Sequence, residues 1–173
     1  MKTLIILIDF YGHPDLTTDR YSDNVRYSYL TEIISSSHID KKQISFYTNE
    51  IDPRDLRLRE LKHMAISNGF NWVDEIPKDI DNTNTQIIVT GANTSGCVFD
   101  KEDIGVYHWY RHKYKTKIYL PMCAEYEKKG INDFERNMLG ITSLFKKMQK
   151  LKCFNLKICE EIGDLKLTYL SKK

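Results

Sequence analysis

The sequence has few features that would divide the chain into separate parts. Its 173 residues include only four prolines, and we find no internal repeat and no low-complexity linker. A chain of this length can bury a sizeable hydrophobic core. We therefore predict a single domain that spans residues 1–173.

The chain also has little net charge and no long apolar run. Its formal charge is +2, and acidic and basic residues are interspersed until a lysine-rich end, so we expect neither a nucleic-acid nor a membrane surface. The N-terminal apolar run stops at Asp9, which makes it too short for a signal peptide or a membrane span. We expect a cytoplasmic protein that acts on a small-molecule partner, and a homo-oligomer stays open.

The chain contains no Cys-x-x-Cys pair, although it has four cysteines: Cys97, Cys123, Cys153 and Cys159. In a reducing compartment this spacing indicates free thiols rather than a zinc or redox site. His108 and His112 have the spacing of one helix face. Without a third ligand in view, we interpret them as a surface pair and predict no metal site.

Short apolar runs alternate with stretches of helical periodicity. The runs typical of buried strands are 3–10, 43–48, 86–90, 117–122 and 154–162. Helical patterns cover 22–37, 131–151 and the stretch after Cys97, whereas 54–82 predicts one or two helical pieces, around Leu58 to Ala65 and Trp72–Ile76. This alternation predicts a three-layer α/β/α domain with a mainly parallel, doubly wound sheet. We expect strand 4–8 to neighbour strand 86–90.

Two candidate groups fall at the carboxyl ends of predicted strands, where such sheets gather their reactive groups. They are Asp9 and the loop that runs from Gly91 to Cys97. The loop does not fit a dinucleotide fingerprint, which needs three glycines in the first strand–helix turn, because only Gly91 and Gly96 are present halfway along the chain. A thiol at a helix start is favoured as thiolate by the helix dipole, and nearby backbone N–H groups can hold an oxyanion. We expect Cys97 to be the most acidic thiol.

The run Gly91-Ala-Asn-Thr94-Ser-Gly-Cys97-Val98 resembles the Gly-x-x-Thr-x-x-Cys-Val signature of the isochorismatase-like cysteine hydrolases. That family includes nicotinamidases and carbamoyl-amide hydrolases. The first apolar run, which ends at Asp9, is similar to the family strand that carries the catalytic Asp. Lys62, 35 positions before Cys97, lies close to the spacing of the family's catalytic Lys. The resemblance covers nearly the whole chain and implies the same three-layer fold.

The resemblance implies a mechanism for the hydrolysis of a small amide or carbamoyl C–N bond. Asp9 would take the thiol proton, Cys97 would attack the carbonyl carbon to form a thioester-type intermediate, and Lys62 would balance the charges. The backbone N–H groups of Asn93 and Cys97 would hold the oxyanion, helped by a cis peptide between Ala92 and Asn93. The resemblance implies no organic cofactor, and no metal because the family's metal-binding histidines are missing.

Two alternatives stay open. Lys78 could replace Lys62, although it leaves less chain for the intervening helix. The domain could also be a catalytically inactive member that binds a small molecule or a protein, which would fit the bulky Tyr107, Trp109 and Tyr110 after Cys97. The aromatic cluster at 107–114 could be helix packing, or it could line a pocket for a planar substrate.

Overall fold

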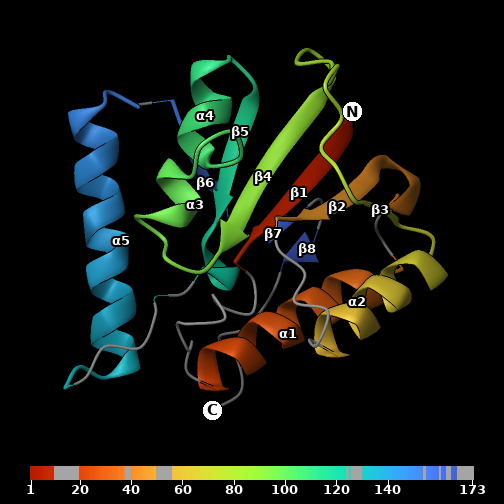
Figure 1. Ribbon diagram of the computed structural model, residues 1–173, viewed down its shortest axis with the longest axis horizontal. Coiled ribbons are helices and arrows are strands. Elements are labelled where there is room, and N and C mark those ends of the chain that lie inside the picture. Colours follow the sequence, from red (N-terminus) through yellow and green to blue (C-terminus); the bar gives the residue numbers. More distant parts are fainter. Residues whose placement is uncertain are drawn as a thin grey trace.

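The chain folds around one six-stranded sheet in which every neighbouring pair of strands is parallel (Figure 1). The computed structural model describes residues 1–9, 20–37, 40–49, 56–123, 125, 130–153, 155–159, 161–162 and 165–166. The strands of the sheet are β1 (Lys2–Ile8), β2 (Ile44–Thr48), β3 (Asn71–Val73), β4 (Thr85–Gly91), β5 (Lys115–Tyr119) and β6 (Lys157–Cys159). Their spatial order is β3-β2-β1-β4-β5-β6. A separate antiparallel pair joins β7 (Glu161–Ile162) to β8 (Leu165–Lys166).

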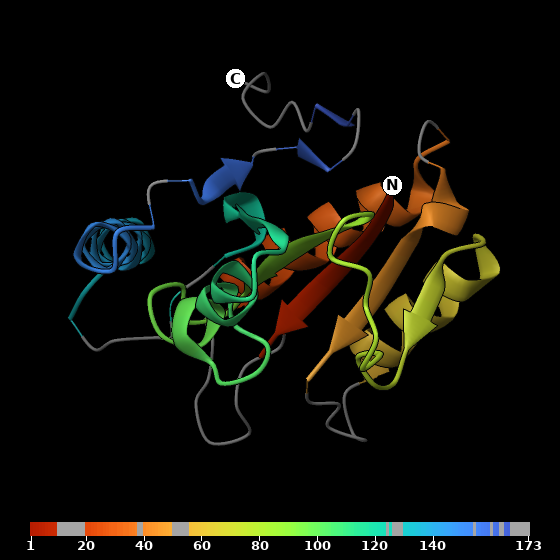
Figure 2. The same ribbon diagram turned by 90° about the horizontal axis from the view of Figure 1, so that it is seen from above.

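Helices cover both faces of this sheet (Figures 1 and 2). They are α1 (Arg20–Ser35), α2 (Leu56–Ser67), α3 (Cys97–Asp100), α4 (Val106–Arg111) and α5 (Asp133–Lys150). Ile5 and Leu7 of β1 pack in a cluster with residues of α1 and α2. Leu4 and Ile6 point to the opposite face and pack in a cluster with residues of α3, α4 and α5. This alternation within one strand confirms the predicted three-layer fold, because both faces of β1 are buried.

The register confirms that strand 4–8 neighbours strand 86–90. β1 pairs with β4 over its whole length, from Lys2 opposite Thr85 to Ile8 opposite Gly91. The chain leaves β1 toward β2 on one side and leaves β4 toward β5 on the other. The carboxyl ends of β1 and β4 therefore form the switch point of a doubly wound sheet, which is where ligands bind in this architecture.

Gly91 allows this switch point to close tightly. Its φ is +137°, and a Cβ atom placed on it would lie 1.8 Å from the carbonyl oxygen of Ile8. The next residue, Ala92, donates its backbone N–H to that same oxygen at 3.0 Å. Only glycine fits a backbone of this conformation so close to another strand.

Two of the predicted helical stretches are wrong in detail. A helix does form around Leu58 and Ala65, but Trp72 lies in the short strand β3, opposite Phe46 of β2, and the two rings pack with centroids 5.6 Å apart. The stretch after Cys97 forms two short helices rather than one, because the chain turns between them at Asp103, whose φ is +64°. In both places a tertiary contact or a turn overrides the local apolar pattern.

Two predicted strands are shorter than expected. The strand predicted over 117–122 ends at Tyr119, after which Leu120–Met122 forms a 3-10 turn that contains Pro121. Within 154–162, β6 covers Lys157–Cys159, while residues 154 and 160 lie outside the described part of the chain. The helix predicted over 131–151 is confirmed as α5. None of the described helices is long and apolar enough to cross a membrane.

We predict that Gly91→Ala destabilises the fold by more than about 3 kcal/mol, because it combines backbone strain with a clash against the Ile8 carbonyl. Gly69→Ala is the matched control, since Gly69 also has a positive φ, +90°, but faces open space. The control should cost only about 1–2 kcal/mol. Urea unfolding at neutral pH measures both variants, and equal losses would show that the approach of β4 to β1 is not a tight contact.

Candidate active site

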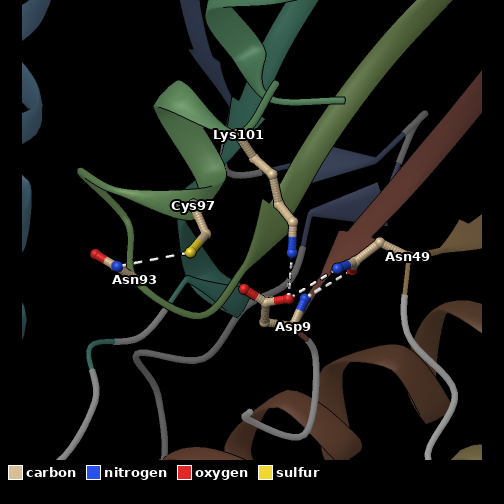
Figure 3. Close-up of polar contacts among 5 residues, drawn as sticks. All are labelled: Asp9, Asn49, Asn93, Cys97 and Lys101. Atoms are coloured by element: carbon tan, nitrogen blue, oxygen red, sulfur yellow. Dashed lines mark hydrogen bonds and ion pairs between the residues drawn. The ribbon is translucent and has the colours of Figure 1, made fainter. Parts of the chain in front are cut away.

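Asp9 lies immediately after β1, at the switch point, and its side chain is only 3% exposed. Its backbone has a φ of +45°, a conformation that non-glycine residues adopt at a cost. Asn49, which follows β2, contacts Asp9 twice (Figure 3). The Asp9 backbone N–H donates to Asn49 Oδ1 at 2.9 Å, and Asn49 Nδ2 donates to Asp9 Oδ1 at 2.8 Å. Asn49 thus fixes both the backbone and the carboxylate of Asp9.

Lys101 supplies the cation of the site. Its Nζ lies 2.7 Å from Asp9 Oδ1. Lys101 is the C-cap of α3 and follows Cys97 by four positions, so both side chains lie on the same side of one helical turn. Figure 3 shows Lys101 reaching from that turn to Asp9, while the Cys97 sulfur contacts Asn93. Asp9, Cys97 and Lys101 therefore converge although they come from two elements only.

The expected convergence of Lys62 on this site is wrong. Lys62 lies in the middle of α2, where its Nζ pairs with Asp74 at 2.5 Å, just after the edge strand β3. Its distance from Cys97 along the chain matches the family spacing, but the residue lies on a helix, beside buried Leu61, and not at a strand end. The alternative, Lys78, is exposed in the segment between β3 and β4.

The Cys97 thiol opens α3 and is partly buried beside Asp9. Asn93 Nδ2 donates to its sulfur at 3.6 Å. Burial raises the pKa of Cys97, a hydrogen bond to Asp9 and the charge of that carboxylate raise it further, and Lys101 and Asn93 lower it only in part. The pKa of Cys97 is therefore raised and not lowered, and its place as the most acidic of the four thiols stays a prediction. α3 is a single turn, so its dipole is small, and an anion lies next to the sulfur.

The pKa of Asp9 moves in the opposite direction. Burial alone would raise the pKa of this carboxyl group, but hydrogen bonds from Lys101, Asn49 and Cys97 outweigh the burial and lower the pKa below its ordinary value of 3.8. At neutral pH the site therefore holds a carboxylate, an ammonium group and a protonated thiol. A carboxylate next to a protonated thiol is a candidate acceptor for the thiol proton.

The backbone after β4 offers donors for an oxyanion. Among the described residues, the N–H groups of Asn93 and Cys97 donate to no acceptor, whereas the N–H of Thr94 donates to Glu125 Oε1 at 2.8 Å. The expected cis peptide between Ala92 and Asn93 is absent, because no described peptide bond is cis. The chain turns there with Asn93 at φ +57° and Gly91 at φ +137° instead.

Side chains from outside the loop hold it in place. Glu125 accepts from Thr94, and it packs so closely on Gly140 of α5 that a Cβ atom there would lie 2.0 Å from Glu125 Oε1. Lys147, also on α5, donates to the carbonyl of Ser95 at 2.6 Å and pairs with Asp100 at the end of α3. Glu125 and α5 therefore hold both the loop after β4 and the end of α3.

Lys101 and Asn49 are the two site residues that the sequence reasoning missed. The signal for Lys101 is its spacing of four from Cys97, which places it on the same helix face. The signal for Asn49 is its place just after an apolar strand, the same criterion that singles out Asp9. Within the described residues, no group of three or more His, Cys, Asp or Glu side chains could hold a metal ion.

Comparison with family models gives no match, and neither does comparison with curated proteins. The fold is similar to the crystal structure of an isochorismatase-like hydrolase from Alkaliphilus metalliredigens, with a TM-score of 0.48 and 14% sequence identity. The superposition covers 91% of this chain and 94% of that one. The contacts within the site, and not this similarity, support the proposals below.

We predict that substitutions at Asp9 and Lys101 shift the reactivity of Cys97 in opposite directions. Asp9→Asn removes the charge that raises the pKa of Cys97, so alkylation should begin at lower pH than in the wild type. Lys101→Met removes a charge that lowers this pKa, so alkylation should begin at higher pH. Iodoacetamide labelling across pH, followed by peptide mass spectrometry, measures the shifts.

Cys123 is the internal control for this experiment. Burial raises the pKa of its thiol to about 11, and Asp9 and Lys101 are not among the causes. Its labelling should therefore start late and at the same pH in all variants. Shifts of Cys97 in the same direction in both variants would contradict the arrangement in Figure 3.

We predict that Asn49→Asp destabilises the fold by about 2–4 kcal/mol at neutral pH, because it replaces the amide that donates to the Asp9 carboxylate by a second carboxylate. The loss should shrink at pH 4.5, since one of two adjacent carboxylates then takes a proton. Asn68→Asp is the control, because Asn68 is exposed and donates only to the carbonyl of Met64. Equal losses in urea unfolding at both sites would rule out the role of Asn49.

Proposed function

We propose that the protein is a cysteine hydrolase that cleaves a C–N bond, in an amide or carbamoyl group, of a small molecule. The observation that carries the proposal is the shared carboxylate of Asp9. It accepts hydrogen bonds from the Lys101 ammonium group and the Asn49 amide, its charge raises the pKa of the neighbouring Cys97 thiol, and it is almost completely buried. A buried thiol has no structural need for a carboxylate and a cation, whereas a nucleophile needs both.

Because Asp9 is ionised and the Cys97 thiol is protonated in the resting site, the first step is a proton transfer between them. Asp9 takes the Cys97 proton as the sulfur attacks the carbonyl carbon, and the negative charge moves from the carboxylate to the substrate oxygen. Lys101, which contacts Asp9 and lowers the pKa of Cys97, stays close to the negative charge before and after the transfer. The free N–H groups of Asn93 and Cys97 are the candidate donors to the oxyanion.

The remaining steps return every group to its starting state. Asp9 gives its proton to the leaving nitrogen as the C–N bond breaks, and a thioester on Cys97 remains. A water molecule then loses a proton to Asp9 and attacks the thioester. The acid leaves, and the thiolate takes the proton back. Lys101 replaces Lys62 in this proposal, because Lys62 is paired with Asp74 elsewhere.

The family resemblance supports the choice of an amide or carbamoyl substrate. The alternative function is a catalytically inactive domain that binds a small molecule or a protein. Two of the bulky residues that favoured this alternative have packing roles. Trp109, on α4, is buried in the core, and Tyr107 stacks on Phe99 with ring centroids 5.8 Å apart. The presence of a cation at Asp9 favours catalysis over binding alone.

We predict that p-nitrophenyl acetate acylates Cys97 and that the acyl group then turns over. Lys101→Met and Asp9→Asn should each slow turnover by about 100-fold or more, as expected for loss of a proton acceptor or of its partner. Lys62→Met is the matched control and should retain wild-type rates, because Lys62 contacts Asp74 and not the site. Nitrophenolate release measures the rates, and intact-protein mass spectrometry detects the acyl group.

The same assay separates the two candidate functions. A panel of small primary amides and carbamoyl compounds, tested by ammonia release, would then identify the substrate class. If the acyl group stays on Cys97 without turnover, or if Cys97 is acylated no faster than Cys153, the protein is a binding domain rather than a hydrolase.

A further inference from the structure

The outer face of α5 carries a concentration of exposed apolar side chains. Of the seven large apolar side chains that are exposed among the described residues, four belong to this helix: Phe134, Met138, Leu139 and Phe145. Figures 1 and 2 show α5 at the rim of the molecule, with α3 and α4 on its inner side. Large apolar side chains that are grouped on the surface of a soluble protein indicate an interaction surface.

Three of these side chains form a stripe together with Ile141. Phe134, Met138, Ile141 and Phe145 follow one another at steps of four, three and four residues, which places them on one face of the helix. The exposed fractions are 75% for Phe134, 45% for Met138 and 49% for Phe145, and Ile141 is partly buried. Neither hydrophobic core cluster of the described residues contains any of the four. We call these four residues the α5 stripe.

A different face of α5 packs on the rest of the domain. Arg136, Gly140 and Leu144 are buried and follow one another at steps of four residues. Lys147 lies on the same side as these three and donates to the carbonyl of Ser95 in the loop after β4. The α5 stripe is therefore not the face that attaches the helix to its own domain. A second apolar face on one helix needs a second surface to cover it.

The charges beside the α5 stripe differ between its two ends. Glu135 flanks the first half of the stripe, and Lys146 flanks the second half. These two residues are eleven positions apart, which is close to three helical turns, so they lie on the same flank. Both are exposed, and neither forms an ion pair with another described residue. The flank is thus acidic at one end and basic at the other.

A second copy of this chain matches this pattern when the two α5 helices run antiparallel. Phe134 and Phe145 are also eleven positions apart. A two-fold axis at the middle of the α5 stripe therefore places Phe134 beside Phe145 of the second copy, and Met138 beside Ile141 of the second copy. The same axis brings like flanks together in reverse order, so that Glu135 faces Lys146 of the second copy. Parallel helices would place Lys146 beside Lys146, which their like charges disfavour.

We propose that the protein forms a two-fold symmetric homodimer in which the α5 stripes of two copies pack antiparallel against each other. The 18 residues of α5 give a contact about 27 Å long, so the interface is small and its affinity moderate. The opposite charges on the flank fix the direction of the helices, and the apolar stripe supplies most of the affinity. This proposal does not depend on the proposed hydrolysis, since the α5 stripe shares no residue with the site around Cys97.

Sedimentation equilibrium of the full chain tests the dimer. Wild-type protein should change from monomer to dimer with a Kd in the range of about 1–100 µM. Phe134→Gln/Phe145→Gln should raise this Kd by at least about 100-fold, because each dimer loses four buried aromatic rings. A wild-type chain that stays monomeric at about 500 µM would overturn the proposal. A double variant that associates as the wild type does would overturn it as well.

Leu139→Gln is the matched control. Leu139 is 57% exposed on the same helix, but it lies about 140° around the helix axis from Phe134 and therefore outside the α5 stripe. Its substitution should leave the Kd unchanged, and weakening equal to that of the double variant would contradict a defined interface. Urea unfolding at protein concentrations well below the Kd compares the monomers. All three proteins should unfold at the same midpoint, because the substituted side chains are exposed in the monomer.

Charge reversal tests the pairing without changing any apolar contact. Glu135→Lys should raise the Kd about fivefold or more, because it places two lysines together at both ends of the interface. Glu135→Lys/Lys146→Glu should return the Kd to within about twofold of the wild type, since each pair again has opposite charges. If the single reversal has no effect, Glu135 does not face Lys146 and the antiparallel arrangement is wrong.

Disulfide cross-linking tests the direction of the helices. A mixture of Phe134→Cys and Phe145→Cys chains should form a disulfide between positions 134 and 145 under mild oxidation, identified by peptide mass spectrometry. Phe134→Cys chains alone should not link through position 134, because its two copies lie about 16 Å apart along antiparallel helices. Efficient linkage between two copies of position 134 would indicate parallel helices and would overturn the proposal.

Discussion

The contact between the Asp9 carboxylate and the Lys101 ammonium group is the interaction on which the site depends. A buried carboxylate is costly unless a cation and hydrogen-bond donors surround it, and here Lys101, Asn49 and Cys97 all do so. These contacts draw together the ends of β1 and β2 and the first turn after β4. The same contacts lower the pKa of Asp9, and the Asp9 charge raises the pKa of Cys97, so an ionised carboxylate lies next to a protonated thiol.

The fold and two of the three charged or thiol residues of the candidate site could be predicted from the sequence, because both follow from local patterns. An apolar run that ends in Asp9, and a second that ends in a loop of small residues before Cys97, each place a group at a strand end. Parallel pairing of those two strands then brings the groups together. The loop begins with a glycine because the backbone of Gly91 lies against the Ile8 carbonyl oxygen, which also accepts the hydrogen bond from the Ala92 N–H.

The cation could not be predicted by the same means. Sequence spacing selected Lys62, but spacing along the chain does not determine which element a residue occupies, and α2 directs Lys62 to Asp74. Lys101 was missed because the helix expected after Cys97 was predicted from its apolar residues and not from the cation four positions after the thiol. In the structure α3 ends after one turn at Asp100, and Lys101 is its C-cap, directed at Asp9.

Cys97 and Lys101, the proposed nucleophile and its counterion, therefore lie at the start and at the C-cap of one helical turn, and this couples their positions. A change that unwinds this turn displaces the sulfur and the ammonium group together, and it leaves Asp9 buried without its cation. The same unwinding would remove the burial and the Asp9 charge that raise the pKa of Cys97, so the folded turn is what keeps this thiol protonated.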